Sequence, residues 1–438
     1  MAMQDRSGVM EKLMSLGKRK GFIFQSSEIY GGLGSTWDYG PLGVELKRKI
    51  TDHWWTEVVS KRENVVGMDA AILMNPKVWE ASGHVGSFQD PLVECGECRR
   101  RFRSDHVAGE VCPECGGALS EPRMFNLMFK TFVGPLEDEG NIVFLRPETA
   151  QGIFVNFRNV QEASRQKIPF GIAQIGKAFR NEITVGNFIF RSREFQQMEL
   201  EWFCHPDEAD KWYEYWIQAR FDWYLKLGVT RERLRLRPHE PDELAHYAKG
   251  CQDVEYEFPF GWSELEGIAD RGTYDLDQHL EHSGKDIRYL DPISHEKYVP
   301  VVIESSGGVD RTVLTILADA YDEDEIKGEQ RMLLRFAPHI APVQAAVFPL
   351  VKREGMPETA HGIVEELRKY AWNALYDEGG SIGRRYRRMD EVGTPFCITV
   401  DGQTSEDQTV TVRDRDTLEQ ERVSTGSLIE YLAEHLNP

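Results

Sequence analysis

The sequence predicts an α+β protein with two folded parts, a larger one built on a mostly antiparallel sheet with helices and a smaller C-terminal α/β module. Three observations support this fold class. A chain of 438 residues can bury two or three cores. Strand-like segments in its larger part follow one another mostly without helical crossovers, which is typical of antiparallel sheets. A junction at 338–342, bounded by prolines, then separates residues 1–337 from 338–438, where strands and helices alternate.

The composition predicts a soluble, cytoplasmic protein without a membrane partner. Apolar residues make up 41% and charged residues 28% of the chain, and no apolar run is long enough to span a bilayer. Residues 1–20 have no uninterrupted apolar core, so they are not a secretory signal. The net charge of -20 counts against general attraction to nucleic acid. Basic clusters at 18–20, 99–103 and 384–388 can still hold RNA locally, although each alone is more simply a solvated charged face.

Seven cysteines fall into two groups. Three are scattered and are most simply buried small hydrophobes: Cys204, Cys251 and Cys397. Four form two Cys-x-x-Cys pairs with a short spacer: Cys95, Cys98, Cys112 and Cys115. This spacing is typical of a four-cysteine zinc knuckle, here inserted at 89–122; disulfides are the alternative, which a cytoplasmic setting disfavours. Four thiolates leave no open position on the metal, so the expected Zn²⁺ is structural.

The first elements of the larger part follow from glycine content and apolar spacing. Residues 31–43 are rich in glycine but match neither a P-loop nor a dinucleotide-binding fingerprint, so we expect a structured loop. A helix follows from Pro41, with apolar residues every four positions on one face: Leu46, Ile50, Trp54 and Val58. A strand is expected at 65–74.

The sheet is predicted from four later segments, 142–145, 170–179, 188–190 and 196–203. In the last of these, apolar and polar residues alternate between the two faces. The apolar set is Met198, Leu200 and Trp202, and the polar set is Gln197, Glu199 and Glu201. An apolar face below and a carboxylate-bearing face above suit the floor of an open active site, although a solvent-exposed sheet face has the same pattern.

Helices are expected at 209–227 and 242–250, then a strand at 298–304 and a buried helix from Val309. In the C-terminal module the expected order is strand 344–350, helix 358–376, a short basic helix, strands 396–400 and 409–413, and helix 426–436.

Two arginine-bearing segments carry the chemistry. The first is Phe179-Arg180-Asn181-Glu182, followed after a loop by Phe190-Arg191-Ser192-Arg193-Glu194-Phe195. Arginine suits forked contact with phosphate oxygens, and a phenylalanine beside it can stack on a base. The second is Gly307-Gly308-Val309-Asp310-Arg311, where glycines let a ligand approach the backbone. Each segment is a weak signal alone, but together and in this order they are specific.

With these segments the chain resembles the class II aminoacyl-tRNA synthetases, whose second and third motifs they match. More closely, it is similar to the homodimeric glycyl-tRNA synthetases. The matching stretches are 29–32, 79–84, 146–152, 195–199, 262–265 and 382–388. The resemblance implies a class II catalytic domain with the zinc-knuckle insertion, a C-terminal anticodon-binding domain and a homodimer. It also implies ligation of glycine to the 3′ end of tRNA(Gly) through glycyl-adenylate, with ATP and Mg²⁺.

The resemblance implies roles for individual residues. Arg180 is expected to hold the α-phosphate of ATP and Arg311 the γ-phosphate, while Phe195 stacks on adenine. The full ATP set is Arg180, Asn181, Glu182, Phe190, Arg191, Ser192, Arg193, Glu194, Phe195, Glu264, Leu265, Gly308, Val309, Asp310 and Arg311. Glu264 or Glu304 is expected to reach Mg²⁺.

The glycine set implied is Arg103, Glu148, Phe195, Gln196, Gln197, Met198, Glu199, Glu304, Ser305, Ser306, Gly307 and Gly308. Carboxylates suit the ammonium group of an amino acid, and a pocket filled up to the Cα excludes larger amino acids by steric clash, so no editing domain is needed. In the C-terminal module, Tyr386 within the basic cluster 384–388 is available to stack on an unpaired base.

Two other functions are compatible with parts of the pattern. One is a synthetase for alanine, serine or threonine. The other is a non-catalytic relative that binds nucleic acid as an accessory of a mitochondrial DNA polymerase. Such a relative has no need of Arg180, Arg311 and the carboxylates, whose presence argues against it.

Overall fold

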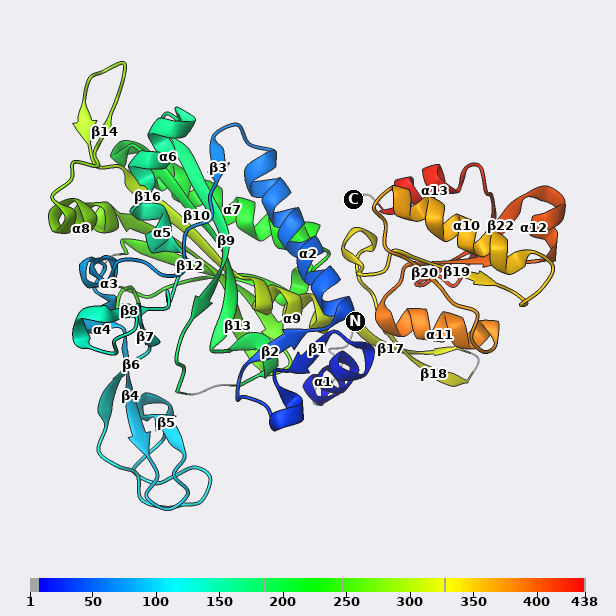
Figure 1. The fold of residues 1–438 in the computed structure, drawn as a ribbon, viewed down its shortest axis with the longest axis horizontal. Helices are drawn as coiled ribbons and strands as arrows, with labels where there is room; N and C mark the ends of the chain where they lie inside the picture. The colour runs from blue at the N-terminus through cyan, green and yellow to red at the C-terminus, as the bar shows by residue number, and fades with distance from the viewer. Residues whose placement is uncertain (1–7, 184–185, 246–247, 327, 437–438) are drawn as a thin grey trace.

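The computed structural model describes residues 8–183, 186–245, 248–326 and 328–436. Figure 1 shows a larger body and, beside it, a smaller C-terminal body. A seven-stranded sheet in the order β11-β12-β13-β16-β10-β9-β3 organises the larger body. Its strands are β3 (Val65–Gly67), β9 (Phe170–Phe179), β10 (Glu194–Cys204), β11 (Leu234–Pro238), β12 (Gly250–Phe258), β13 (Gly261–Gly272) and β16 (Val301–Gly308). Only β3 and β9 pair in parallel, so the expected, mostly antiparallel sheet is confirmed.

One face of this sheet is covered by long helices that form the main apolar core. They are α1 (Val9–Lys20), α2 (Pro41–Trp55), α7 (Ala209–Lys226) and α9 (Val309–Ala320). The apolar stripe predicted on α2 lies in this core. Its last member, Val58, lies in the π-helical turn Thr56–Ser60 that continues α2. The apolar set of β10 packs into the same core, as its alternation predicts.

The opposite face is covered only at one end. There α5 (Ala150–Phe154), α6 (Phe157–Ser164) and α8 (Tyr274–Ser283) enclose a second apolar cluster with Phe170 and Phe203 of the sheet. The rest of this face carries the polar residues of β10.

Smaller elements surround the sheet. Of the loop expected at 31–43, only residues 31–36 lie between β1 (Ile23–Gln25) and β2 (Trp37–Tyr39), which pair with each other, and Pro41 already begins α2. The cysteine-bearing insertion projects from the larger body in Figure 1 as a three-stranded sheet of β4 (Gln89–Glu94), β5 (Arg101–Arg103) and β6 (Arg123–Asn126). The remaining elements of this part are α3 (Pro76–Ala81), α4 (His84–Ser87), β7 (Lys130–Phe132), β8 (Ile142–Phe144), β14 (Tyr289–Leu290) and β15 (Lys297–Tyr298).

The C-terminal body has its own five-stranded sheet in the order β20-β19-β21-β22-β23 and its own apolar core. Its elements are β19 (Ala345–Pro349), α10 (Met356–Lys369), β20 (Ala374–Tyr376), α11 (Ile382–Val392), β21 (Phe396–Val400), α12 (Gly402–Asp407), β22 (Thr409–Asp414), β23 (Gln420–Ser424) and α13 (Leu428–Leu436). Parallel and antiparallel pairs meet in this sheet, and helices lie between its strands along the chain. None of the helices in the described ranges is long and apolar enough to cross a membrane.

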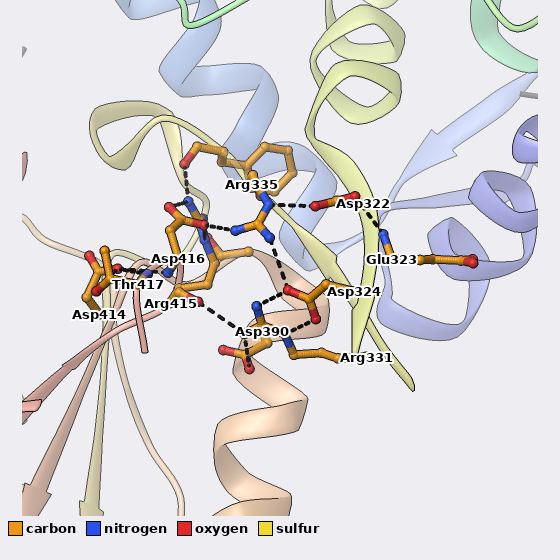
Figure 2. A network of polar contacts seen from close by, with 12 residues as sticks. Asp322, Glu323, Asp324, Arg331, Arg335, Asp390, Asp414, Arg415, Asp416 and Thr417 are labelled. Carbon is orange, nitrogen blue, oxygen red and sulfur yellow. Dashed lines mark hydrogen bonds and ion pairs between the residues drawn. The ribbon is translucent and has the colours of Figure 1, made fainter. Parts of the chain in front are cut away.

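A hairpin of β17 (Tyr321–Ile326) and β18 (Glu329–Leu334) joins the two bodies through charged groups (Figure 2). Arg331 of β18 donates to Asp324 beside it and, 3.0 Å away, to Asp390 of α11. Arg335 bonds Asp416 of the C-terminal body at 2.8 Å. Asp390 is fully buried, so this contact depends on compensated charge and not on apolar packing alone.

Several predicted elements differ in the structure because tertiary pairing overrides local propensity. Residues 241–245 form turns and Gly250 begins β12, so the helix expected at 242–250 is wrong in its described part; residues 246 and 247 lie outside the described ranges. The strand expected at 65–74 is limited to β3, since only those residues pair with β9. The helix expected at 358–376 ends at Lys369, and β20 pairs with β19 instead.

The strand expected at Phe188–Phe190 is a 3-10 turn. Asn187 and Phe188 both have positive φ, 56° and 61°, so the backbone reverses there and cannot extend.

Candidate active site

A pocket of about 390 Å³ lies over the open part of the central sheet. Its lining comes from Glu148 before α5, the loop after β9, the first residues of β10, His239 after β11, and the facing parts of β12, β13, β16 and α9. The structure brings together these predicted site residues: Glu148, Arg180, Glu182, Phe190, Arg191, Ser192, Phe195, Gln196, Gln197, Glu199, Glu264, Glu304, Ser306, Gly307, Gly308, Asp310 and Arg311. Segments far apart in the sequence thus meet in one cavity.

Eight predicted residues do not line this pocket: Arg103, Asn181, Arg193, Glu194, Met198, Leu265, Ser305 and Val309. Strand alternation explains three of them, because Met198 and Leu265 enter the main core and Ser305 donates to buried Glu266 beneath the sheet. Arg193 donates to the carbonyl of Gly34 at 2.6 Å.

Arg103 lies in the insertion, where it is held by two carboxylates. Its Nη1 is 3.0 Å from Asp90, and its Nη2 donates to Asp105 at 2.7 Å. The hydrogen bond to Asp105 does most to raise the pKa of Arg103, and the charges of Asp90 and of Glu182, which lines the pocket, add to it.

The first arginine is positioned by backbone and by aromatic rings. Nε of Arg180 donates to the carbonyl of Pro147 at 3.0 Å. Its guanidinium lies 5.3 Å from the ring of Phe195 and 5.4 Å from that of Phe88. These contacts fix the plane of the guanidinium at the pocket wall, which prepares it for forked contact with an oxyanion.

The second arginine comes from the start of α9. Nη1 of Arg311 is 3.1 Å from Oε2 of Glu264 on β13, and the guanidinium lies 4.5 Å from the ring of Phe190. Burial alone raises the pKa of Glu264, but the charges of Arg311 and Arg180 hold it below its usual value. Glu264 therefore stays ionised between the two arginines.

Asp310 is a structural anchor of the site. Its carboxylate accepts the N–H of Gln196 at 2.7 Å and the ammonium of Lys47 at 3.1 Å, and it is hydrogen-bonded to the hydroxyl of Tyr39. This one buried side chain ties the start of α9 to β10, α2 and β2.

Carboxylates collect at the other end of the pocket. Burial raises the pKa of Glu148, but the charges of His84, whose Nε2 lies 3.3 Å away, and of Arg271 lower it below its usual value. Glu304 forms an ion pair with Arg271, yet burial keeps the pKa of Glu304 raised. This end of the pocket thus brings carboxylates together in a buried setting, which suits an ammonium group.

Beneath these groups lies a cluster of three carboxylates on adjacent strands, Glu199 and Glu201 of β10 and Glu304 of β16, with oxygens within 4.8 Å of one another. Thr149 donates to Glu199 at 2.6 Å. Both oxygens of the fully buried Glu201 lack a hydrogen-bond partner in the described part of the chain. Burial and Glu304 raise the pKa of Glu199 and of Glu201, because three carboxylates this close repel one another in a buried setting.

Sequence reasoning missed six residues of the lining: Ile189, His239, Cys251, Asp253, Gly267 and Arg271. Most of them lie on or beside β11, β12 and β13, strands that were not predicted. The alternation of Val254, Tyr256 and Phe258, all buried, was the signal available for β12.

The four cysteines of the insertion also come together. Sγ of Cys95 and Cys115 are 3.4 Å apart, those of Cys98 and Cys112 are 3.7 Å apart, and all four lie within 4.8 Å of one another. None of the seven cysteines, all within the described ranges, is in a disulfide. Four thiols at these distances can hold a metal ion.

Comparisons with known proteins identify the family of this chain. The family described as "tRNA synthetase class II core domain (G, H, P, S and T)" matches residues 132–320, and "Anticodon binding domain" matches residues 344–435. A glycine–tRNA ligase of Caldanaerobacter subterraneus subsp. tengcongensis is 54% identical over 98% of both chains. That of Treponema denticola is 54% identical over 98% of this chain and 97% of its own, and that of Thermobifida fusca 51% over 99% of both.

The antiparallel sheet, its two motif arginines and these matches define a class II aminoacyl-tRNA synthetase with an anticodon-binding module. Within that class, identities above 50% over nearly the whole chain are specific. The chain belongs to the glycine–tRNA ligase family.

Proposed function

We propose that this chain joins glycine to tRNA(Gly) in two steps at the described pocket. ATP and glycine first form glycyl-adenylate and pyrophosphate, and glycine then passes to the 3′ end of the tRNA. The observation that supports this most strongly is the polarity of the pocket, with Arg180 and Arg311 at one end and Glu148 and Glu304 at the other. A triphosphate and an amino acid ammonium match those two ends.

Arg180 holds the α-phosphate of ATP, and Arg311 holds the γ-phosphate. Phe195 stacks on adenine, and its ring lies 5.3 Å from the Arg180 guanidinium, which places the base beside the α-phosphate contact. Mg²⁺, which class II synthetases use with ATP, is held by Glu264 or Glu304. Glu264 is favoured because its carboxylate remains ionised between the two arginines.

Glycine binds at the carboxylate end. Glu148, Glu199 and Glu304 attract its ammonium, while Ser306, hydrogen-bonded to Gln197 at 3.1 Å, lines the same wall. Selection of glycine is steric, because a pocket filled up to the glycine Cα excludes every amino acid that carries a larger side chain.

The chemical step needs no side-chain nucleophile. The glycine carboxylate attacks the α-phosphorus, and pyrophosphate leaves. The rate enhancement comes from positioning of the two reactants and from neutralisation of the phosphate charge by arginines and Mg²⁺. Arg180, fixed by Pro147 and two rings, is preorganised for this task.

The insertion and the C-terminal module complete the proposal. The four cysteines bind Zn²⁺ as a structural ion, and a backbone N–H of Cys98 lowers the pKa of Cys95 to about 6, which favours a thiolate there. The enzyme works as a cytoplasmic homodimer, and its catalytic domain, 1–337, is followed by an anticodon-binding domain, 338–438. Separate apolar cores support that division.

Contact with the anticodon involves fewer members of the basic cluster 384–388 than its sequence suggests. Arg385 is buried and donates to the carbonyl of Pro349, Arg388 pairs with Asp377, and the hydroxyl of Tyr386 bonds Thr399 at 2.7 Å. Arg384 remains exposed. We therefore assign RNA contact at this cluster to Arg384 in preference to Tyr386.

Amino-acid-dependent pyrophosphate exchange tests the proposed function. Glycine should support exchange, while alanine and serine should not, and Arg180→Ala should abolish exchange with an unchanged circular dichroism spectrum. Exchange with alanine or serine as fast as with glycine would overturn the substrate assignment. Exchange that survives in Arg180→Ala would overturn the role of that arginine.

A further inference from the structure

One wall of the pocket carries three metal-ligating side chains that the proposed reaction does not use. His239 directly follows β11, and Cys251 and Asp253 are two residues apart on β12, so the last two share one face of the sheet. The backbone N–H of His239 donates to the carbonyl of Cys251 at 2.9 Å, which brings the strand ends into register. All three side chains line the pocket.

Their donor atoms are close enough to share one ion. Nε2 of His239 lies 2.8 Å from Oδ2 of Asp253, and these atoms and Sγ of Cys251 all lie within 4.8 Å of one another. Ligands of a tetrahedral Zn²⁺, with bonds of about 2.0–2.3 Å, stand about 3.3–3.8 Å apart. Small changes of side-chain rotamer bring the three donors to that spacing.

We propose that His239, Cys251 and Asp253 form a second, pocket-facing site for a thiophilic divalent cation, with Zn²⁺ as the reference ion. One nitrogen, one sulfur and one carboxylate oxygen are the ligand types that Zn²⁺ takes in proteins. Three protein ligands leave a fourth position, which is open to the pocket because all three residues line it. The four-cysteine cluster differs in this respect, since it fills all four positions itself.

The surrounding charges favour a cation at this wall. Glu264 of β13 lines the same pocket and adds a further carboxylate at this wall. Arg237 of β11 opposes a cation, at 3.4 Å from Asp253, but it is already paired with Glu243 and Glu255. A divalent ion would balance one thiolate and one carboxylate at this wall.

Metal counting on the full-length protein tests this site. The protein is equilibrated with a tenfold excess of Zn²⁺, freed of loosely bound ion, and assayed for zinc per chain by mass spectrometry. Wild type should hold one equivalent more than Cys251→Ser and one more than Asp253→Asn. Cys204→Ser, at a cysteine buried in the main core whose thiol donates to the carbonyl of Val301, should match wild type and serves as the control. The difference between variants is the readout, so the result does not depend on whether the four-cysteine cluster is filled.

Cobalt gives a second readout that a fold defect would not imitate. Metal-free protein is titrated with Co²⁺, and thiolate-to-cobalt charge-transfer absorption at saturation should be equal in wild type and Cys204→Ser but lower in Cys251→Ser. Equal zinc content in wild type, Cys251→Ser and Asp253→Asn would overturn the proposal. Equal cobalt absorption at saturation in wild type and Cys251→Ser would overturn it as well.

Discussion

Arg311 and Glu264 form an ion pair across the pocket, with Nη1 and Oε2 3.1 Å apart, although α9 and β13 approach each other only through the tertiary fold. The pair keeps the second arginine over the cavity in the absence of a ligand. ATP phosphates must compete with Glu264 for Arg311, or share it through Mg²⁺.

This pair leads to the first prediction. Arg311→Ala should lower glycine-dependent pyrophosphate exchange by about 10²–10³-fold, because a preorganised cation is lost where charge develops. Arg311→Lys should restore only part of the rate, since an ammonium lacks the forked geometry. Arg158→Ala, which removes an exposed arginine paired with Glu162, should retain the wild-type rate. An Arg311→Ala enzyme as fast as the Arg158 control would contradict the assignment.

Arg271 gives a pH-dependent prediction. Burial already raises the pKa of Glu304 although Arg271 opposes this, so Arg271→Ala should raise it further. Because ionised Glu304 attracts the glycine ammonium, the KM for glycine should increase and recover as pH rises. Profiles of kcat/KM for glycine against pH should therefore show an acid limb displaced to higher pH in Arg271→Ala and partly restored in Arg271→Lys. Identical profiles for wild type and Arg271→Ala would remove Arg271 from substrate binding.

The charged junction in Figure 2 predicts a large loss of stability on substitution. Asp390 accepts hydrogen bonds from Arg331 at 3.0 Å and from Arg413 at 2.9 Å while fully buried. Asp390→Ala leaves two buried guanidinium groups without this partner, which should cost about 3–5 kcal/mol of unfolding free energy. Denaturant unfolding followed by circular dichroism measures the loss.

Glu366→Ala is the matched control for Asp390→Ala. Glu366 pairs with Lys369 on the exposed side of α10, so this change should alter the unfolding free energy by less than about 0.5 kcal/mol. Equal losses in the two variants would show that the junction does not depend on its buried charges.

His53 predicts acid sensitivity near the junction. Burial lowers the pKa of His53 to about 4, with a further contribution from His339, and its Nδ1 accepts the Nε1–H of Trp223 at 2.9 Å. The folded pKa lies below the unfolded value of about 6.5, so this stabilisation is complete above pH 6.5 and is lost as pH falls towards 4. After allowance for partial exposure, the effect should be about 1 kcal/mol.

Thermal unfolding at pH 7.5 and pH 5 measures this loss. His53→Gln should lose less stability than wild type between the two conditions, while His435→Gln, at an exposed position, should behave as wild type. A wild-type difference that His53→Gln leaves unchanged would assign the acid sensitivity to other groups.

Removal of metal from the four-cysteine cluster gives the last prediction. Under the proposed zinc assignment, the ion orders the loops around Cys95 and Cys112, so chelation should release the insertion and displace Arg103. Aminoacylation should fall by at least about tenfold, while the unfolding transition of the C-terminal module stays in place. A loss of aminoacylation accompanied by an equal loss of the C-terminal module's stability would indicate that the ion stabilises the whole chain. Limited proteolysis within 89–122 reports the release directly.

Local sequence patterns predicted those elements in which buried apolar residues repeat at a regular spacing along the chain. The strand expected at 170–179 matches β9, and the alternation of 196–203 placed Met198 and Glu199 on the correct faces of β10. These elements were predictable because each buries one face and their periodicity survives in the sequence. The helix expected at 242–250 was wrong because the end of that segment, Gly250, begins β12, which pairs with β11 and β13.

The sequence by itself determined the family, the motif arginines and the cysteine cluster, because each is a fixed set of residue types at short spacing. Only the tertiary structure decided which partners they meet. Arg271, His239, Cys251 and Asp253 reach the pocket through pairing of strands that no local pattern predicted. The pairing of Arg311 with Glu264 likewise joins residues 47 positions apart. Contacts of that kind follow from burial of the whole sheet, which lowers the free energy of the chain collectively and leaves little trace in any single segment.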